Sequence, residues 1–159
     1  MFAQKDFEID RVLCKPLMAH LSTVANGEPR DSPVWFVWEQ ASLWIFGTEK
    51  DSFIKRLKRE PRCALGVVDF GLQKGILKHV GIRGIAKIHP MDQIRLRRFV
   101  SKYLGENSSD WNKWFMANIV DPLNVMVQIV PISIVAKDVS FFKTGPNLAS
   151  AEYKGFPFY

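Results

Sequence analysis

The chain has few cysteines, no long apolar run and no leader-like apolar stretch at its start. Only two cysteines occur among 159 residues, Cys14 and Cys63, and they lack metal-ligand spacing. A disulfide-held secreted scaffold would need a denser set, so we expect two reduced, buried thiols. No apolar run approaches the ~20 residues of a membrane-spanning helix, and the acidic N-terminus lacks the apolar core of a signal peptide. These absences predict a cytoplasmic protein with no membrane partner.

The residue patterns of the common hydrolytic and metal-dependent active sites are also missing. The sequence has no paired carboxylates at helical spacing, no nucleophile elbow and no cluster of metal ligands. We therefore predict no metal site, and we assign no side chain a catalytic role.

Length and charge indicate one globular domain with an anionic partner. A chain with 47% hydrophobic and 24% charged residues can bury one substantial core, so we expect a single domain over 1–159, with a tail at 143–159. The net charge of +6 favours an anionic partner without selecting one. Two basic runs, 55–59 and 95–98, are interrupted by apolar residues at helical spacing, which indicates solvated helix faces. Because the nearby aromatics fall on the apolar faces, we expect no nucleic-acid binding.

Alternating apolar residues and turn signals predict a mainly β fold. Asn26-Gly27 is a hairpin turn signal, and a flexible connection with two glycines is expected at 71–78. The expected strands occupy residues 17–25, 30–39, 43–48, 63–70, 79–89 and 122–142, the last bent at Pro131. This order predicts a six-stranded antiparallel barrel with helices in its connections.

Helices are expected before the first strand and in two of the connections. The helix after the third strand has Asp51 or Ser52 as its N-cap and Phe53 on its buried face. Another helix is expected at 93–104 with Asp92 as its N-cap, and a short helix rich in aromatic residues follows it.

The stretch 30–39 is apolar on both of its faces. Val34 and Phe36 alternate with Pro33 and Trp35, whereas a strand with one solvated face would alternate apolar and polar residues. One face is expected to fill the barrel, and the other to meet a partner subunit, a helix or a ligand. Since Pro33 cannot donate to a ladder, it belongs at an edge or an irregularity, where neighbouring backbone groups are free to meet a ligand.

Five pieces of the sequence, in a fixed order and spacing over about half of the chain, carry a family resemblance. They are Leu21-Ser22-Thr23-Val24, Asn26-Gly27-Glu28-Pro29-Arg30 with Ser32-Pro33-Val34-Trp35-Phe36, Leu43-Trp44-Ile45-Phe46-Gly47-Thr48, 57–65 with Glu60-Pro61-Arg62, and His79-Val80-Gly81-Ile82-Arg83-Gly84-Ile85-Ala86. Together they resemble the flavin-binding split barrel of pyridoxamine 5'-phosphate oxidase-like proteins.

The resemblance implies a homodimer that binds flavin mononucleotide (FMN) in the cleft between its subunits. The isoalloxazine would lie along the second strand at Pro33, Val34 and Trp35, residues that dimer packing would also explain. His79 falls near a family position that contacts the ring through a polar side chain, and Arg30 aligns with a frequent basic position. Each of these two residues is also compatible with a simple surface position.

The resemblance places the phosphate of FMN at the end of the third strand, near Gly47 and Thr48. On physical grounds, Thr48, Lys50 and Ser52 supply two hydroxyls and an ammonium beside free N–H groups at a helix N-terminus, which suits a dianionic phosphate. A capped, solvated helix start would contain the same residues.

The chain departs from the family at the phosphate-binding serine and lysine. Asp51 and Phe53 occupy the two places, counted back from Pro61. Lys50 or Lys55 could supply the positive charge while Asp51 turns away to cap the helix.

The resemblance implies a flavin-dependent oxidoreductase acting on a small, unidentified substrate. One alternative is a non-catalytic module that stores or senses a flavin or holds haem, for which His20, His79 and His89 are the available histidines. Another is a deazaflavin-dependent reductase, which would need more basic residues around a longer anionic tail. The substrate-binding residues of the true oxidase are not recognisable in the C-terminal part, so a vitamin B6 enzyme is not expected.

Overall fold

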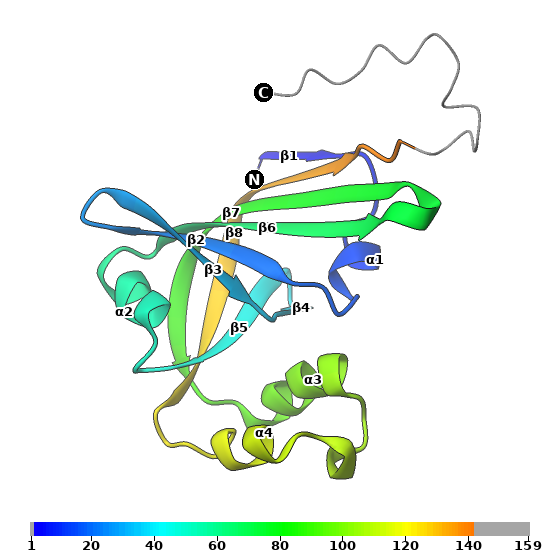
Figure 1. Cartoon of the computed structure of the whole chain (residues 1–159). Coiled ribbons are helices and arrows are strands. Elements are labelled where there is room, and N and C mark those ends of the chain that lie inside the picture. Colours follow the sequence, from blue (N-terminus) through cyan, green and yellow to red (C-terminus); the bar gives the residue numbers. More distant parts are fainter. Residues whose placement is uncertain (1, 142–159) are drawn as a thin grey trace, which may run out of the picture.

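The computed structural model describes residues 2–141 (Figure 1). The tail expected at 143–159 lies outside these residues. The elements follow in the order β1 (Phe2–Lys5), α1 (Asp10–Leu13), β2 (Ala19–Ala25), β3 (Glu28–Val34), β4 (Val37–Glu39), β5 (Ser42–Thr48), α2 (Ser52–Arg59), β6 (Arg62–Gly71), a 3-10 turn (Leu72–Lys74), β7 (Ile76–Pro90), α3 (Gln93–Leu104), a second 3-10 turn (Ser108–Asp110), α4 (Lys113–Asn118) and β8 (Asn124–Asp138).

The strands form one curved sheet that is almost entirely antiparallel. Its order is β3-β2-β6-β7-β8-β5-β4, and β1 pairs in parallel with β8 outside this path. The expectation of an antiparallel sheet with helices in its connections is confirmed, but the expected number of six strands is wrong. The described residues form eight strands, because 30–39 divides into β3 and β4 and the unexpected β1 adds to β8.

The division of 30–39 occurs at Trp35 and Phe36, between two strands at opposite ends of the sheet order. Here the N–H of Phe36 donates to the hydroxyl of Tyr103, at 3.0 Å, instead of to a neighbouring strand. Pro33 lies on the edge strand β3, opposite His20, as a residue without an N–H donor requires.

The segment 71–78 is a hairpin rather than the flexible connection that its glycines indicated. β6 and β7 pair up to Gly71 and Ile76, and Gly75 closes the turn between them with a left-handed φ of 61°. The hairpin projects from the body of the sheet (Figure 1).

The irregularity expected at Pro131 is present as a β-bulge between β7 and β8. Gly84 pairs with Pro131 and Arg83 with Ser133, so Ile132 is the extra residue. A side chain at position 84 would place its Cβ only 2.6 Å from the carbonyl oxygen of Val130, so glycine is required by this close approach.

Two hydrophobic cores lie on the two faces of β4 and β5. The first fills the barrel with residues such as Phe36, Leu43 and Ile45. The second packs Val37 and Trp44 against α3, which lies beside α4 below the sheet in Figure 1. The expectation that both faces of 30–39 are covered is therefore confirmed for β4, where α3 covers the second face, but it is wrong for β3, where Arg30, Asp31 and Pro33 are exposed.

The helix signals correspond closely to the observed helix starts. Asp92 caps α3 by accepting the N–H groups of Ile94 and Arg95, at 2.9 and 3.1 Å. Asp51 occupies the N-cap position of α2, but its side chain makes no capping hydrogen bond to that helix. No helix within 2–141 is long and apolar enough to cross a membrane.

The expectation of two buried thiols is wrong for Cys14 and only partly met by Cys63. Cys14 follows α1 and is exposed, and Cys63 on β6 is half-buried. Burial raises the pKa of the Cys63 thiol to about 12, which makes it a poor nucleophile.

Candidate functional site

The residues of the loop between β5 and α2 form hydrogen bonds with one another. The Asp51 carboxylate accepts the N–H of Thr48 at 2.8 Å, and the carbonyl of Thr48 accepts the N–H of Asp51 at 2.9 Å. The hydroxyl oxygen of Thr48 accepts the N–H of Lys50 at 3.1 Å. Asp51 thus turns back toward Thr48, and the N–H groups of Thr48, Lys50 and Asp51 already have acceptors within the loop.

The first turn of α2 keeps free donors. Within residues 2–141, the backbone N–H groups of Ser52, Phe53 and Ile54 have no acceptor, while the N–H of Lys55 begins the helical pattern by donating to Asp51 at 3.2 Å. Such amides carry the positive end of the helix dipole and favour an anion.

Gly47 allows α2 to pack closely on the end of β5. A Cβ at this position would lie 2.8 Å from the Phe53 ring and 3.1 Å from the Ile54 side chain. The Phe53 ring therefore belongs to the packing around the barrel core, and only its backbone remains for a ligand.

A half-buried arginine, Arg56, lies one helical turn beyond Ser52. Its Nε donates to the hydroxyl of Thr23 at 2.7 Å, and one Nη donates to the hydroxyl of Ser32 at 3.1 Å. The sequence placed Arg56 in a solvated basic run and missed this site. The spacing of four residues from Ser52 was the available signal, because it puts both side chains on one face of a helix.

The strand residues predicted to bind the cofactor lie beside this arginine. Arg30 stands opposite Thr23 in the β2–β3 ladder, so both face the same side of the sheet. Its guanidinium is exposed and contacts Glu28 at 2.7 Å. Pro33 is exposed on the edge strand, and Val34 is buried in the barrel core.

Trp35 lies between two aromatic rings of the helical region. It stacks on Tyr103 with ring centroids 4.4 Å apart and on Phe115 at 5.2 Å, both nearly parallel. Tyr103 comes from α3 and Phe115 from α4, so the ring of Trp35 packs against the helical region in this chain. Its contact with a flavin stays a prediction.

Two neighbouring residues of α3 hold the break between β3 and β4. Lys102 donates from Nζ to the carbonyls of Leu13 and Phe36, both at 2.9 Å, and lies 3.8 Å from the centre of the Phe36 ring. The Tyr103 hydroxyl accepts the N–H of Phe36 and donates to the carbonyl of Leu17 at 2.8 Å. Burial lowers the pKa of Lys102 to about 8 and raises that of Tyr103 to about 12.

The second basic run is solvated at Arg97 and Arg98, as expected, but Arg95 and Arg98 also form ion pairs with β4. Glu39 of β4 accepts Arg98 at 2.6 Å and Arg95 at 3.1 Å, and Arg95 stacks 3.6 Å over the Trp44 ring. The hydrogen bond from Arg98 lowers the pKa of Glu39. These contacts hold α3 on the sheet.

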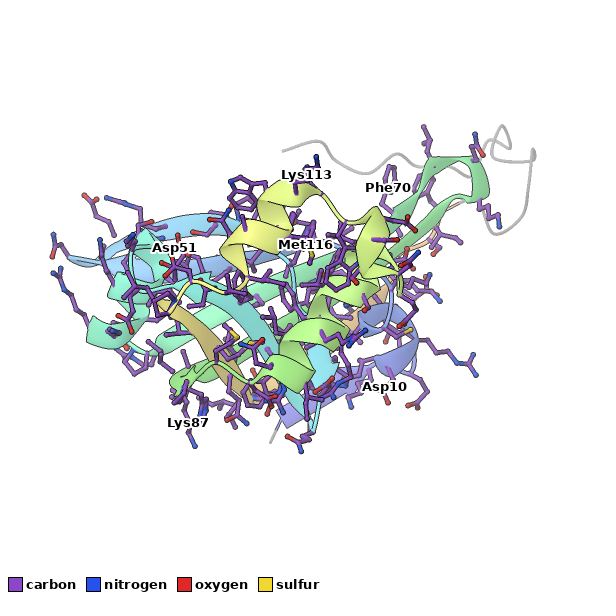
Figure 2. The ribbon with its side chains drawn as sticks, turned by 90° about the horizontal axis from the view of Figure 1, so that it is seen from below. Asp10, Asp51, Phe70, Lys87, Lys113 and Met116 are labelled. Carbon is purple, nitrogen blue, oxygen red and sulfur yellow. The ribbon has the colours of Figure 1, made fainter. Side chains whose placement is uncertain are left out.

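His79 is far from Thr48, although it lies nearer to Pro33, because only β6 and β2 separate β7 from β3 and the His79 ring adjoins Gly66, which pairs with His20 opposite Pro33. It pairs with Lys137 near one end of β8, while Thr48 pairs with Asn124 at the other end, about 40 Å away along a strand that rises ~3.3 Å per residue. The α2 helix and the β6–β7 hairpin lie on opposite sides of Figure 1, and Asp51 and Phe70 lie on opposite sides of Figure 2. A single chain brings together the residues around α2 but not His79.

A cleft of about 730 Å³ opens on the sheet next to Thr23. Its lining includes Ala64, Arg83 and Ser133 from three strands, and its volume is within the range of cofactor sites. No group of side chains in residues 2–141 could hold a metal ion. The free donors at the start of α2 and on Arg56 suit an anion, whereas no residue of α2 lines this cleft.

Comparison with known proteins gives one family and a shared fold. Residues 6–134 match the sequence model of the pyridoxamine 5'-phosphate oxidase family. An F420 reductase is 22% identical, with a TM-score of 0.60, over 79% of this chain and 94% of that chain. A FAD-binding protein from Mesorhizobium loti is 18% identical, with a TM-score of 0.66, over 86% and 96%. The haem storage protein of Vibrio cholerae is 15% identical, with a TM-score of 0.60, over 77% and 87%. No curated protein matches the sequence.

Proposed function

The chain belongs to the pyridoxamine 5'-phosphate oxidase family, and on this premise we propose that it is a homodimeric, FMN-dependent oxidoreductase acting on a small substrate. The observation that carries the proposal is the group of unused donors around α2. The amides of Ser52, Phe53 and Ile54 have no acceptor within residues 2–141, and the guanidinium of Arg56, one turn further along the same helix, keeps donors beyond its two hydrogen bonds, which is the chemistry of a phosphate site.

The dimer is proposed because one chain holds only part of the site. Thr48 is far from His79 on the same chain, so a second copy would have to bring its own His79 to a ring whose phosphate is held beside Thr48. The cleft beside Thr23 is open in the single chain, and a second copy placed over the sheet would close it. Val24 and Ile132, both exposed apolar residues, border the cleft.

A bound flavin would supply the hydride or electron chemistry. The chain would hold the phosphate at α2 and orient the ring along β3 through Pro33, Val34 and the backbone at the strand break. Lys102 and Tyr103 fix that break, because their polar atoms are engaged by the carbonyls and the N–H around Phe36. A single domain over 1–159 and a cytoplasmic location remain parts of this proposal.

The absorption spectrum of the purified protein, before and after denaturation, tests the proposal. We expect a flavin spectrum and release of FMN at about one per subunit, identified by its mass. Release of haem would favour the storage module, and release of a deazaflavin would favour the related reductase. A colourless protein that also fails to take up added FMN would contradict the proposed cofactor.

A further inference from the structure

We propose that Arg56 is the residue that holds the terminal phosphate of the flavin, in place of a lysine from the loop before α2. This inference rests on the proposed function and assigns to Arg56 the charge that Lys50 or Lys55 could have supplied. It starts from the hydrogen-bonding capacity of Arg56 and of the groups around it.

The loop before α2 has few donors left for a ligand. Thr48, Lys50 and Asp51 bind one another through their amides. The carboxylate of Asp51 adds a negative charge at the same place. An anion seated on this loop would have to displace these hydrogen bonds.

Arg56 has the opposite balance of donors and acceptors. A guanidinium carries five N–H donors, and those of Arg56 make two hydrogen bonds, both to neutral hydroxyls. Among residues 2–141 no carboxylate forms an ion pair with Arg56, although Arg30, Arg62, Arg95 and Arg98 each have one. Arg56 is therefore a half-buried positive charge with three further donors and no internal counter-charge.

The hydroxyls of Thr23 and Ser32 determine the direction of the guanidinium. Thr23 is buried, with 1% of its surface exposed, and Ser32 is half-buried on the edge strand. They hold the planar group between α2 and the β2–β3 hairpin, with Arg30 opposite Thr23. A planar guanidinium held from one side can form two parallel hydrogen bonds to a phosphate on the other.

The comparison of FMN with riboflavin isolates the phosphate, because the two ligands share the ring and ribityl chain. Titrations followed by flavin fluorescence should show that Arg56→Gln weakens FMN binding at least about 10-fold, as expected for loss of charge-assisted hydrogen bonds. Riboflavin affinity should change less than about 2-fold by the same reasoning. Arg56→Lys should recover part of the loss, because the charge returns without the planar pair of donors.

Two variants with the same change of charge serve as controls. Arg59→Gln and Lys55→Gln each remove an exposed positive charge from α2, and both should leave the ratio of FMN to riboflavin affinity within about 2-fold of the wild type. A Lys55→Gln loss equal to that of Arg56→Gln would overturn the assignment. Equal losses of FMN and riboflavin in Arg56→Gln would also overturn it, since they would indicate a structural role.

Inorganic phosphate separates this inference from the proposed function. If the wild type binds no flavin, the proposed function fails, but phosphate should still raise the melting temperature of the wild type and Arg59→Gln above that in chloride of equal ionic strength. Arg56→Gln should lose this effect. Equal protection of all three proteins, or of none, would contradict an anion site at Arg56.

Discussion

Two helices bring a positive charge to the strands around the break at Trp35 and Phe36, and they do so with opposite outcomes. On the α3 side, made of Trp35, Lys102 and Tyr103, the ammonium and the hydroxyl are used by backbone groups. On the α2 side, made of Thr23, Ser32 and Arg56, the guanidinium keeps donors without a partner among the described residues. Lys102 uses two of its three N–H donors to hold backbone carbonyls, whereas Arg56 keeps three of its five donors for a ligand.

The comparison extends to the two large clefts. A cleft of about 750 Å³ adjoins Lys102, and one of about 730 Å³ adjoins Thr23. The two sides therefore cannot be distinguished by the volume of their clefts. They differ in how many N–H donors of the nearby cation remain free for a ligand. The predictions below expect stability effects on the α3 side and ligand effects on the α2 side.

The largest effect on stability is expected from Trp35→Ala. Removing a ring stacked between Tyr103 and Phe115 should lower the free energy of unfolding of the cofactor-free protein by about 3 kcal/mol, measured by urea denaturation. If Trp35 served mainly as a flavin contact, Trp35→Ala would lower the free energy of unfolding of the cofactor-free protein by less than about 1 kcal/mol. The α3 side would then have to be counted as part of the ligand site.

Tyr103→Phe should cost less, because the stack with Trp35 remains. The N–H of Phe36 and the carbonyl of Leu17 would lose their partner, at a cost of about 1–3 kcal/mol. The ratio of FMN to riboflavin affinity should stay unchanged. A selective loss of FMN binding in this variant would show that the two sides are not separate.

Lys102→Met should alter the pH dependence of stability, measured by urea denaturation between pH 7 and 10. Burial lowers the pKa of Lys102 to about 8 from its ordinary value of 10.5, so above pH 8 the unfolded chain binds more protons at this site than the folded chain. The free energy of unfolding should therefore rise with pH, relative to Lys102→Met, between pH 8 and 10.5.

The Lys102 comparison is best made with Cys14→Ser in both proteins, because the Cys14 thiolate would interact with the ammonium. The titration of Cys63 is common to both proteins and cancels in the difference. If the difference in free energy of unfolding between the two proteins stayed constant or fell above pH 8, Lys102 would not be in a desolvating environment.

The smallest effect is expected from Asp51→Asn on the α2 side. The asparagine oxygen can still accept the N–H of Thr48, so the loop should keep its shape while losing a negative charge. FMN should bind about 2- to 5-fold more tightly and riboflavin unchanged, by fluorescence titration. Weaker FMN binding would mean that the carboxylate itself supports the site.

Much of the fold could be predicted from the sequence, because turn signals and apolar alternation are local properties. Asp92, Asn26-Gly27 and Pro131 each marked a feature that the structure contains. β1 escaped prediction because its four residues gain their place only by pairing with β8, more than a hundred residues later. The break at Trp35 escaped because an apolar run continues through it, and the hydroxyl that accepts the N–H of Phe36 at the break comes from α3, far along the chain.

The candidate site was less accessible to sequence reasoning. The residues from Thr48 to Phe53 could be proposed from the sequence because they are contiguous, but the hydrogen bonds that occupy the loop donors could not be predicted from composition. Arg56 was missed because its partners, Thr23 and Ser32, lie on strands that precede it by 33 and 24 residues. Such contacts depend on how a helix packs across a sheet, which periodicity does not specify.

Mixed dimers test most directly the central claim that one site is built from two chains. Arg56→Gln and His79→Ala chains, carrying different affinity tags, would be refolded together and the mixed dimers isolated. The account predicts that each parent dimer binds FMN weakly, while the mixed dimer, which has one unaltered site, binds one FMN with wild-type affinity. Mixed dimers that bind no better than either parent, or a monomer that binds FMN fully, would contradict it.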